Sequence, residues 1–130
     1  MLTIGLPLSG IGVYNRMEID SKTASTKTMH AQTVKYISAE IQKCSLGESK
    51  FMGTNQDCPA TAAKAVTGAV NTLTDKNPYL MANNAIRSST AFNEGYVSVS
   101  ASSTTSVLIN TCTKTGCATA DKMTATITVD

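Results

Sequence analysis

Apolar side chains recur with helical spacing through the first third of the chain. Their steps of three, four and seven residues fit the 3.6-residue period of an α-helix, and they fall at Val13, Met17, Ala24, Ala31, Val34, Ile37, Ile41 and Cys44. The pattern is strong from Ala31 onward and weak over residues 20–28, where Ser and Thr dominate and helix propensity is poor. The sequence therefore predicts one long helix over residues 12–44, with a buried C-terminal half and an N-terminal half that protrudes or frays without partners.

A helix of this length is too long for the domain that follows it. At about 1.5 Å per residue it runs about 50 Å, whereas a compact domain of 130 residues has a diameter of roughly 36 Å. A helix that overshoots its own domain needs something else to pack against. The mismatch therefore favours an assembly subunit over a self-contained enzyme.

The middle of the chain, residues 45–95, is expected to be a loop region that contains one short helix. This helix is predicted to open at 59–61, with Asp57 as its cap and Pro59 in its first turn, and to end near 75–78. Residues 80–94 are mixed in character, and we expect a loop with one helical turn around 81–86. The apolar positions of the short helix are Ala62, Ala63, Val66, Ala69, Val70 and Leu73.

The last third of the chain, residues 96–130, changes to the two-residue alternation of half-buried strands. Strands are expected over 96–100, 107–109 and 123–129, with a turn at 102–105. Short connections favour an antiparallel meander with one wet face, and the C-terminal half of the long helix is the natural cover for its apolar face. The predicted fold is a single α+β domain (1–44 helix, 45–95 loop region, 96–130 meander), a long N-terminal α-helix packed on an antiparallel β-meander. We expect its helix–sheet core to comprise Val34, Ile37, Ile41, Val97, Val99, Ile109, Ile127 and Val129.

Four cysteines stand in two close pairs in this Ser- and Thr-rich chain, Cys44 with Cys58 and Cys112 with Cys117. An even count at local spacing predicts two disulfides and an extracytoplasmic location. Of the three connectivities we favour the local one, because each bridge then closes a short loop and contributes about 2–3 kcal/mol before strain. The alternative is a zinc site of four thiolates, but the spacing of the first pair does not fit a zinc-binding knuckle.

Composition and motifs give no positive sign of catalysis. The net charge is +2 and charged residues make up 15% of the chain, so no strong field for nucleic acid is expected. The sequence has no phosphate loop, no nucleophile elbow and no zinc-protease motif. We therefore expect no catalytic residue, no cofactor and no metal.

The ionisable side chains of the long helix have ordinary explanations. His30 is the only histidine, and it lies about 21 Å along the helix from Cys44, too far for a nucleophilic pair. We expect His30 to be exposed or at an interface. Glu18 and Asp20 stand two residues apart and do not face each other on a helix, so they are expected to be solvated or paired with a neighbouring subunit.

The N-terminus, Met1–Val13, is apolar but is too short to span a bilayer, which needs about 20 residues. It also lacks the basic start of a signal peptide. If the cysteines are oxidised, we expect an export signal to be missing from this chain.

The order of a long N-terminal helix, a disulfide-closed loop region, a β-meander and a cysteine-bounded C-terminal loop resembles the globular part of a type IV pilin, in the bacterial type IVa style. The closest segment reads Ile11-Gly12-Val13-Tyr14-Asn15-Arg16-Met17-Glu18-Ile19-Asp20-Ser21-Lys22 and is similar to the stretch that follows the membrane part of the pilin helix. Cys112 and Cys117 would correspond to the cysteines that bracket the pilin D-region. In departure from the pilin pattern, no Glu precedes Glu18, and Gly5, Pro7, Gly10 and Gly12 interrupt the apolar run. The chain thus looks like a pilin whose N-terminal assembly segment is truncated or atypical.

This resemblance implies a non-catalytic structural subunit of a type IV pilus that serves adhesion, twitching motility or DNA uptake. Its partners would be other pilin subunits in a homopolymer, bound through the N-terminal helix with Tyr14, Met17 and Glu18 as expected contacts. The filament would contact a surface or DNA, and the resemblance implies no dedicated small-molecule substrate. The expected location is the extracellular pilus, with an inner-membrane anchor before assembly.

Two alternatives stay open. The first is a minor pilin or a type II secretion pseudopilin; pseudopilins often use calcium in place of the C-terminal disulfide, so Cys112 and Cys117 argue mildly against a pseudopilin. The second is a secreted ligand-binding or adhesin domain, which a concentrated aromatic-lined pocket would favour. The few scattered aromatic residues of this chain do not favour such a pocket.

Overall fold

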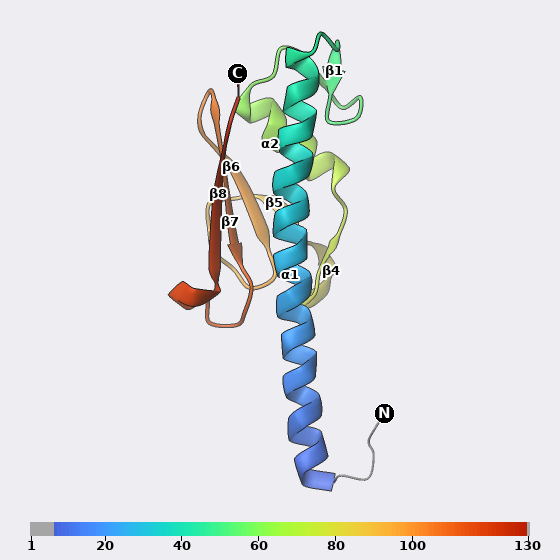
Figure 1. Ribbon diagram of the computed structural model, residues 1–130, viewed down its shortest axis with the longest axis vertical. Coiled ribbons are helices and arrows are strands. Elements are labelled where there is room, and N and C mark those ends of the chain that lie inside the picture. Colours follow the sequence, from blue (N-terminus) through green and yellow to red (C-terminus); the bar gives the residue numbers. More distant parts are fainter. Residues whose placement is uncertain (1–6, 130) are drawn as a thin grey trace.

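One long helix dominates the molecule. A computed structural model describes the backbone of residues 7–129 and the side chains of residues 18–129. In it, α1 (Pro7–Ser45) is a single helix of 39 residues, which at about 1.5 Å per residue is about 58 Å long. Figure 1 shows its C-terminal part lying along the body and its N-terminal part extending beyond the body.

Helix α1 begins earlier than the sequence pattern predicts. It starts at Pro7 instead of Gly12, and it ends at Ser45 instead of Cys44. Proline is tolerated at the first helical position because the N–H it lacks has no partner there. Gly10 and Gly12 each weaken the helix by about 1 kcal/mol relative to alanine, which does not end it.

A four-stranded sheet lies beside α1, with the strand order β5–β6–β7–β8. Its strands are β5 (Ile86–Ser88), β6 (Val97–Ser103), β7 (Ser106–Cys112) and β8 (Lys122–Thr128). The last three strands form an antiparallel meander, in which Ile109 pairs with Val99 on one side and with Ala125 on the other. A short 3₁₀ turn, η1 (Thr119–Asp121), leads into β8.

The segment expected to be a loop, residues 80–94, contains two strands instead. One is β5, which pairs in parallel with β6. The other is β4 (Leu80–Asn84), which pairs with β3 (Lys76–Asn77) in a small antiparallel hairpin. All five residues of β4 are exposed, so it carries no buried-and-exposed alternation that a sequence pattern would reveal.

The second helix, α2 (Ala62–Thr72), is shorter than predicted at both ends. Its cap is Thr61, whose hydroxyl accepts a hydrogen bond from the N–H of Lys64 at 3.2 Å. The prediction of Asp57 as the cap is therefore wrong, and Pro59 precedes the helix. Asp57 belongs to β2 (Gln56–Asp57), which pairs with β1 (Lys50–Phe51).

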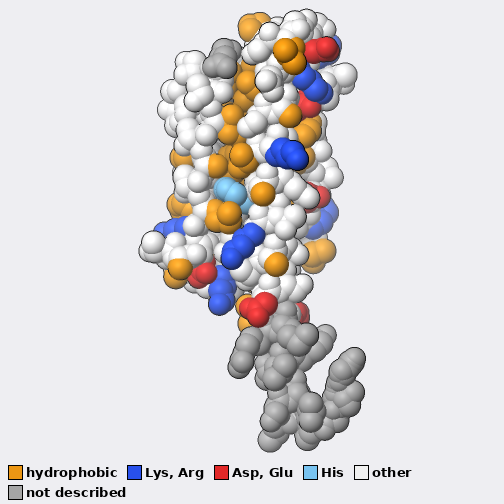
Figure 2. All heavy atoms as spheres, in the orientation of Figure 1, with side chains coloured by type: hydrophobic (Ala, Val, Ile, Leu, Met, Phe, Trp, Pro, Cys, Tyr) orange, Lys and Arg blue, Asp and Glu red, His pale blue; other side chains and the backbone are white. Residues whose placement is uncertain are grey.

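The core lies between α1, α2 and the inner face of the sheet. Ile37 is fully buried, and it belongs to one cluster with Ile41, Val97, Val99, Ile109, Ile127 and Val129, while Val34 is half-buried against that cluster. Figure 2 shows apolar side chains gathered along the seam between α1 and the sheet, with the pale blue histidine among them. The largest aliphatic side chains of α1 thus meet the aliphatic face of the meander.

The buried face of α1 is less apolar than the sequence pattern suggests. Ala24 and Ala31 of the predicted stripe are exposed, whereas Thr26 and Thr33 are buried. Each buried threonine donates its hydroxyl proton to the carbonyl four residues earlier, at 2.8 Å for Thr26 and 2.7 Å for Thr33. A hydroxyl that is satisfied within its own helix leaves the methyl group free to pack, so threonine can occupy a core position here.

The outer face of the sheet is covered over β6 and β7 in part, whereas Thr124, Thr126 and Thr128 of β8 are exposed there, as a wet face predicts. Ser98 on this face is fully buried, and Asn110 is nearly so. The segment between β5 and β6 crosses over them: Asn110 donates to the carbonyl of Thr90 at 3.0 Å, and the N–H of Gly95 donates to the carbonyl of Cys112 at 2.8 Å. The sheet is therefore enclosed on both sides over part of its length.

Two disulfides close short loops, Cys44–Cys58 and Cys112–Cys117. This is the local pairing, and it leaves no thiolates for the alternative zinc site. The first bridge ties the end of α1 to the loop that follows it. Near this bridge, the buried Glu40 carboxylate accepts from the N–H of Gly53 at 2.9 Å and lies 2.7 Å from the Lys43 ammonium. Burial alone would raise the pKa of Glu40, but these bonds outweigh burial and hold that pKa below its ordinary value.

Candidate functional site

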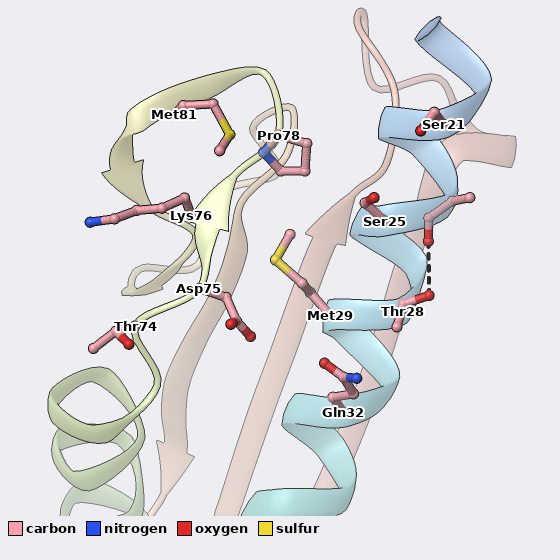
Figure 3. Close-up of a pocket in the computed structure, with 11 residues that line it drawn as sticks. Ser21, Ser25, Thr28, Met29, Gln32, Thr74, Asp75, Lys76, Pro78 and Met81 are labelled. Atoms are coloured by element: carbon pink, nitrogen blue, oxygen red, sulfur yellow. Dashed lines mark hydrogen bonds between the residues drawn. The ribbon is translucent and has the colours of Figure 1, made fainter. Parts of the chain in front are cut away.

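An open groove runs between α1 and the hairpin formed by β3 and β4. It has a volume of about 740 Å³, and we call it the α1–β4 groove. Figure 3 shows its two walls, one from α1 and one from the segment 74–81. The α1 wall presents mostly small side chains, and the full lining is Ser21, Ala24, Ser25, Thr28, Met29, Gln32, Thr74, Asp75, Lys76, Pro78 and Met81.

The chemistry of the groove is apolar with one acidic group. Met81 is 66% exposed on one wall, and Met29 is buried on the other. Figure 3 shows the Asp75 carboxylate on the inner side of its wall, facing the α1 turn that carries Met29 and Gln32. Lys76 points away, and its ammonium donates to the Asn84 side chain at 2.7 Å. Among the described side chains, residues 18–129, no ion pair includes Asp75.

Tyr79 fixes the point at which α1 leaves the body. Its hydroxyl donates to the carbonyl of Thr113 at 2.8 Å and lies 3.2 Å from the hydroxyl of Thr23 on α1. Three segments therefore meet at one phenol: α1, the hairpin that carries Tyr79 and the start of the C-terminal disulfide loop. This junction orients α1 and places the α1–β4 groove directly beside the part of the helix that extends outward.

His30 lies in the seam between α1 and the sheet, so the expectation of an exposed histidine is wrong. It is 6% exposed, and its Nδ1 is 2.7 Å from the hydroxyl oxygen of Thr111 in β7. Thr111 pairs with Val97 and Met123 on the neighbouring strands, neither of which carries a charge. Burial therefore lowers the pKa of His30 below its ordinary value, because the imidazolium would lose hydration without gaining an anionic partner.

We predict that the free energy of unfolding decreases as the pH falls from 7.5 to 5.5. The unfolded state binds a proton at His30 near pH 6.5, whereas the folded state does so at a lower pH, so acid favours unfolding in this window. Urea denaturation at both pH values measures the effect, and His30→Gln, which does not titrate, should flatten the pH dependence. An unchanged pH dependence in that variant would contradict the assignment to His30.

The predicted subunit contacts lie at the extended end of α1. Tyr14 and Met17 fall outside the residues whose side chains the structure describes. Glu18 is half-exposed and forms an ion pair with Lys22, one helical turn later, at 3.3 Å. Ile19 beside it is 43% exposed.

The α1–β4 groove was missed by sequence reasoning. Its second wall, around Asp75 and Met81, was predicted to be the end of a helix and a loop. The signal that marks this wall is the sequence Asn77-Pro78, which is typical of a turn. A turn alone does not say which surface lies opposite it.

Other features of the described part of the chain bear on function. Residues 18–129 contain no cluster of three or more His, Cys, Asp or Glu side chains placed to hold a metal ion. Within the described residues, no helix combines the length and apolar character that crossing a membrane requires. No family model, curated protein or solved structure matches this chain.

Proposed function

We propose that this chain is a structural, non-catalytic subunit of a filament of the type IV pilus kind, which assembles through its N-terminal helix. One observation carries the proposal: α1 is far longer than the body it packs on, and its N-terminal part extends away from the body (Figure 1). A helix without tertiary packing is only marginally stable in water. Such a helix needs a partner, and another copy of the same subunit is the simplest one.

Two features fit this role. The two disulfides suit a protein that works outside the reducing cytoplasm, as an extracellular pilus does. The α1–β4 groove is broad and open, which suits contact with a protein surface better than enclosure of a small substrate. Adhesion, twitching motility and DNA uptake are the activities that such a filament would serve, and an inner-membrane anchor before assembly belongs to the same proposal.

The test is photo-crosslinking in cells that produce the protein. A benzophenone amino acid placed at Tyr14 should give a ladder of covalent dimers, trimers and larger species, because this position lies on the part of α1 assigned to subunit contacts. The same probe at Thr104, in the exposed turn between β6 and β7, is the matched control and should give few multimers. A single monomeric band from the Tyr14 probe would contradict the filament proposal.

A further inference from the structure

We propose that the free edge of β8 pairs antiparallel with β8 of a second copy of this chain, so that the two sheets join across a two-fold axis at Ala125. The α1 helices of two copies related in this way run in opposite directions. The contact is therefore separate from filament assembly through α1 and does not depend on it. Four features support it: the backbone groups of the edge, its lack of protection, the apolar seam beside it and the self-complementary sequence of β8.

The edge presents a regular row of backbone groups. Strand β8 is the last strand of the sheet, and within residues 7–129 no strand pairs with its outer side. At one end the carbonyl of Asp121 accepts from the N–H of Thr113 at 2.8 Å, and at the other the N–H of Val129 donates to the carbonyl of Thr105 at 2.7 Å. In an antiparallel ladder, residues whose backbone groups face the partner strand alternate with residues whose groups face away. Both bonds therefore direct the odd-numbered residues of β8 toward β7 and leave the N–H and C=O groups of the even-numbered residues pointing outward.

This edge has few of the features that protect sheet edges. Natural edge strands are usually short, bulged, interrupted by proline or rich in charge. Strand β8 has seven residues, none of them proline, and only Lys122 is charged. It pairs with β7 without a shift of register. The strand at the opposite edge, β5, has only three residues, so β8 is the edge that can receive another strand.

An apolar seam lies beside the edge. The odd-numbered side chains of β8 point to the α1 side, where Met123 and Ala125 are half-buried, and Val34 on α1 is half-buried against the same core. Apolar side chains are visible at the surface between β8 and α1 (Figures 1 and 2). A strand added to β8 would lay its own inward side chains on this seam and remove apolar surface from water.

A second β8 has the sequence that this edge requires. The incoming strand needs apolar side chains on the α1 side and polar side chains on the other, and β8 alternates in this way over its whole length. A two-fold axis at Ala125 joins outward-facing residues in hydrogen-bonded pairs, and it sets Lys122 opposite a threonine instead of opposite another lysine. The pairs across the axis are Lys122 with Thr128, Met123 with Ile127, Thr124 with Thr126, and Ala125 with itself.

The two α1 helices leave room for this pairing. Helix α1 packs against β6, β7 and β8, so its axis lies near the middle strand of the meander. With strands about 4.8 Å apart, β7 lies about 7 Å from the two-fold axis, which sets the two helices about 14 Å apart. A helix with its side chains is about 10–12 Å wide. The helices can therefore lie side by side on the joined sheet without overlap.

An engineered cysteine tests the axis directly. Ala125→Cys places two thiols across a non-hydrogen-bonded pair, whose Cα atoms are about 4.5 Å apart and so within the range of a disulfide. All four native cysteines are already bridged, so they do not interfere. Mild oxidation of the full chain should give mostly covalent dimer on a non-reducing gel.

Thr128→Cys is the matched control on the same strand. In the proposed register the two copies of this residue are roughly 20 Å apart, so the variant should stay mostly monomeric. Random collision would instead favour the exposed Thr128 over the half-buried Ala125. A yield of dimer from Thr128→Cys that equals or exceeds the yield from Ala125→Cys would overturn the proposal.

A second pair of variants tests the backbone bonds. In the Ala125→Cys chain, Thr126→Pro removes one outward N–H and should slow dimer formation about tenfold, whereas Thr126→Val keeps that N–H and should not. Proline is tolerated where the N–H of an edge strand faces solvent, so the melting temperature of the dilute protein should hold. Equal rates for the proline and valine variants would overturn strand pairing, and if Thr126→Pro does not fold, the two cysteine variants decide alone.

The occupant of the edge is tested in cells that produce the protein. A benzophenone amino acid at Thr126 should capture residues of β8 from a second copy. Capture of a different protein, together with a monomeric Ala125→Cys variant, would assign the edge to a foreign strand and overturn the pairing of two copies.

Discussion

Replacement of Ile37 by alanine is expected to lower the free energy of unfolding by about 2–5 kcal/mol. Ile37 is completely buried where α1 meets the sheet, so the truncation loses the transfer energy of the removed carbons and leaves a cavity that the rigid seam cannot fill. A domain of this size is stable by only about 5–15 kcal/mol. A fall of the melting temperature by roughly 10 °C or more should be visible by circular dichroism.

Ile19→Ala is the matched control for Ile37→Ala. It is the same substitution on the same helix, but Ile19 is 43% exposed, and surface changes usually stay within about 0.5 kcal/mol. Thermal melts of both variants compare the two sites directly. An equal loss of stability at Ile19 and Ile37 would mean that α1 is packed as tightly near its extended end as at its centre, which would remove the observation on which the filament proposal depends.

Replacement of Gly95 by alanine is expected to be the other strongly destabilising change, at about 3 kcal/mol or more. Gly95 has φ +77°, and a Cβ there would lie 2.0 Å from Oδ1 of Asn77 and 2.8 Å from the ring of Tyr79. Asn77 is fully buried. Its Oδ1 accepts from the N–H of Tyr79 at 2.7 Å, and its amide donates to the carbonyl of Glu94 at 2.9 Å. Any movement of Asn77 to make room would leave these buried polar groups without partners.

Gly116→Ala separates the collision from the backbone strain. Gly116 also has a positive φ of +90°, but a Cβ there would meet nothing within 4 Å. The substitution should therefore cost only the strain of a left-handed conformation, about 1 kcal/mol. Urea denaturation of both variants gives the difference. If the two losses are equal, Asn77 yields to the new methyl group at little cost, and its hydrogen bonds contribute little to stability.

The general layout of the fold was predictable because it depends on local patterns. The steps between Val34, Ile37 and Ile41 identify the buried half of α1, and the alternation over residues 123–129 identifies the last strand. The short spacing within each cysteine pair indicates the local disulfides. Each of these signals lies within one segment and needs no knowledge of the rest of the chain.

What could not be predicted depends on partners far apart in the chain. His30 is buried, although a scale of residue hydrophobicity places it outside, because it bonds Thr111 across 81 residues. Strand β5 has only three residues, too few for an alternation. The two walls of the α1–β4 groove come from segments about 50 residues apart, so no single stretch of the sequence predicts the groove.

The direction of α1 has a mechanical consequence. Strands β6, β7 and β8 run roughly along the helix (Figure 1), and the seam between them contains the buried side chains of α1 from His30 to Ile41. A pull on the outer end of α1 would therefore act along the seam and strain its contacts together, instead of peeling them apart one after another. The junction at Tyr79 would share this load with the C-terminal disulfide loop. The same packing that stabilises the domain at rest thus orients it to withstand tension.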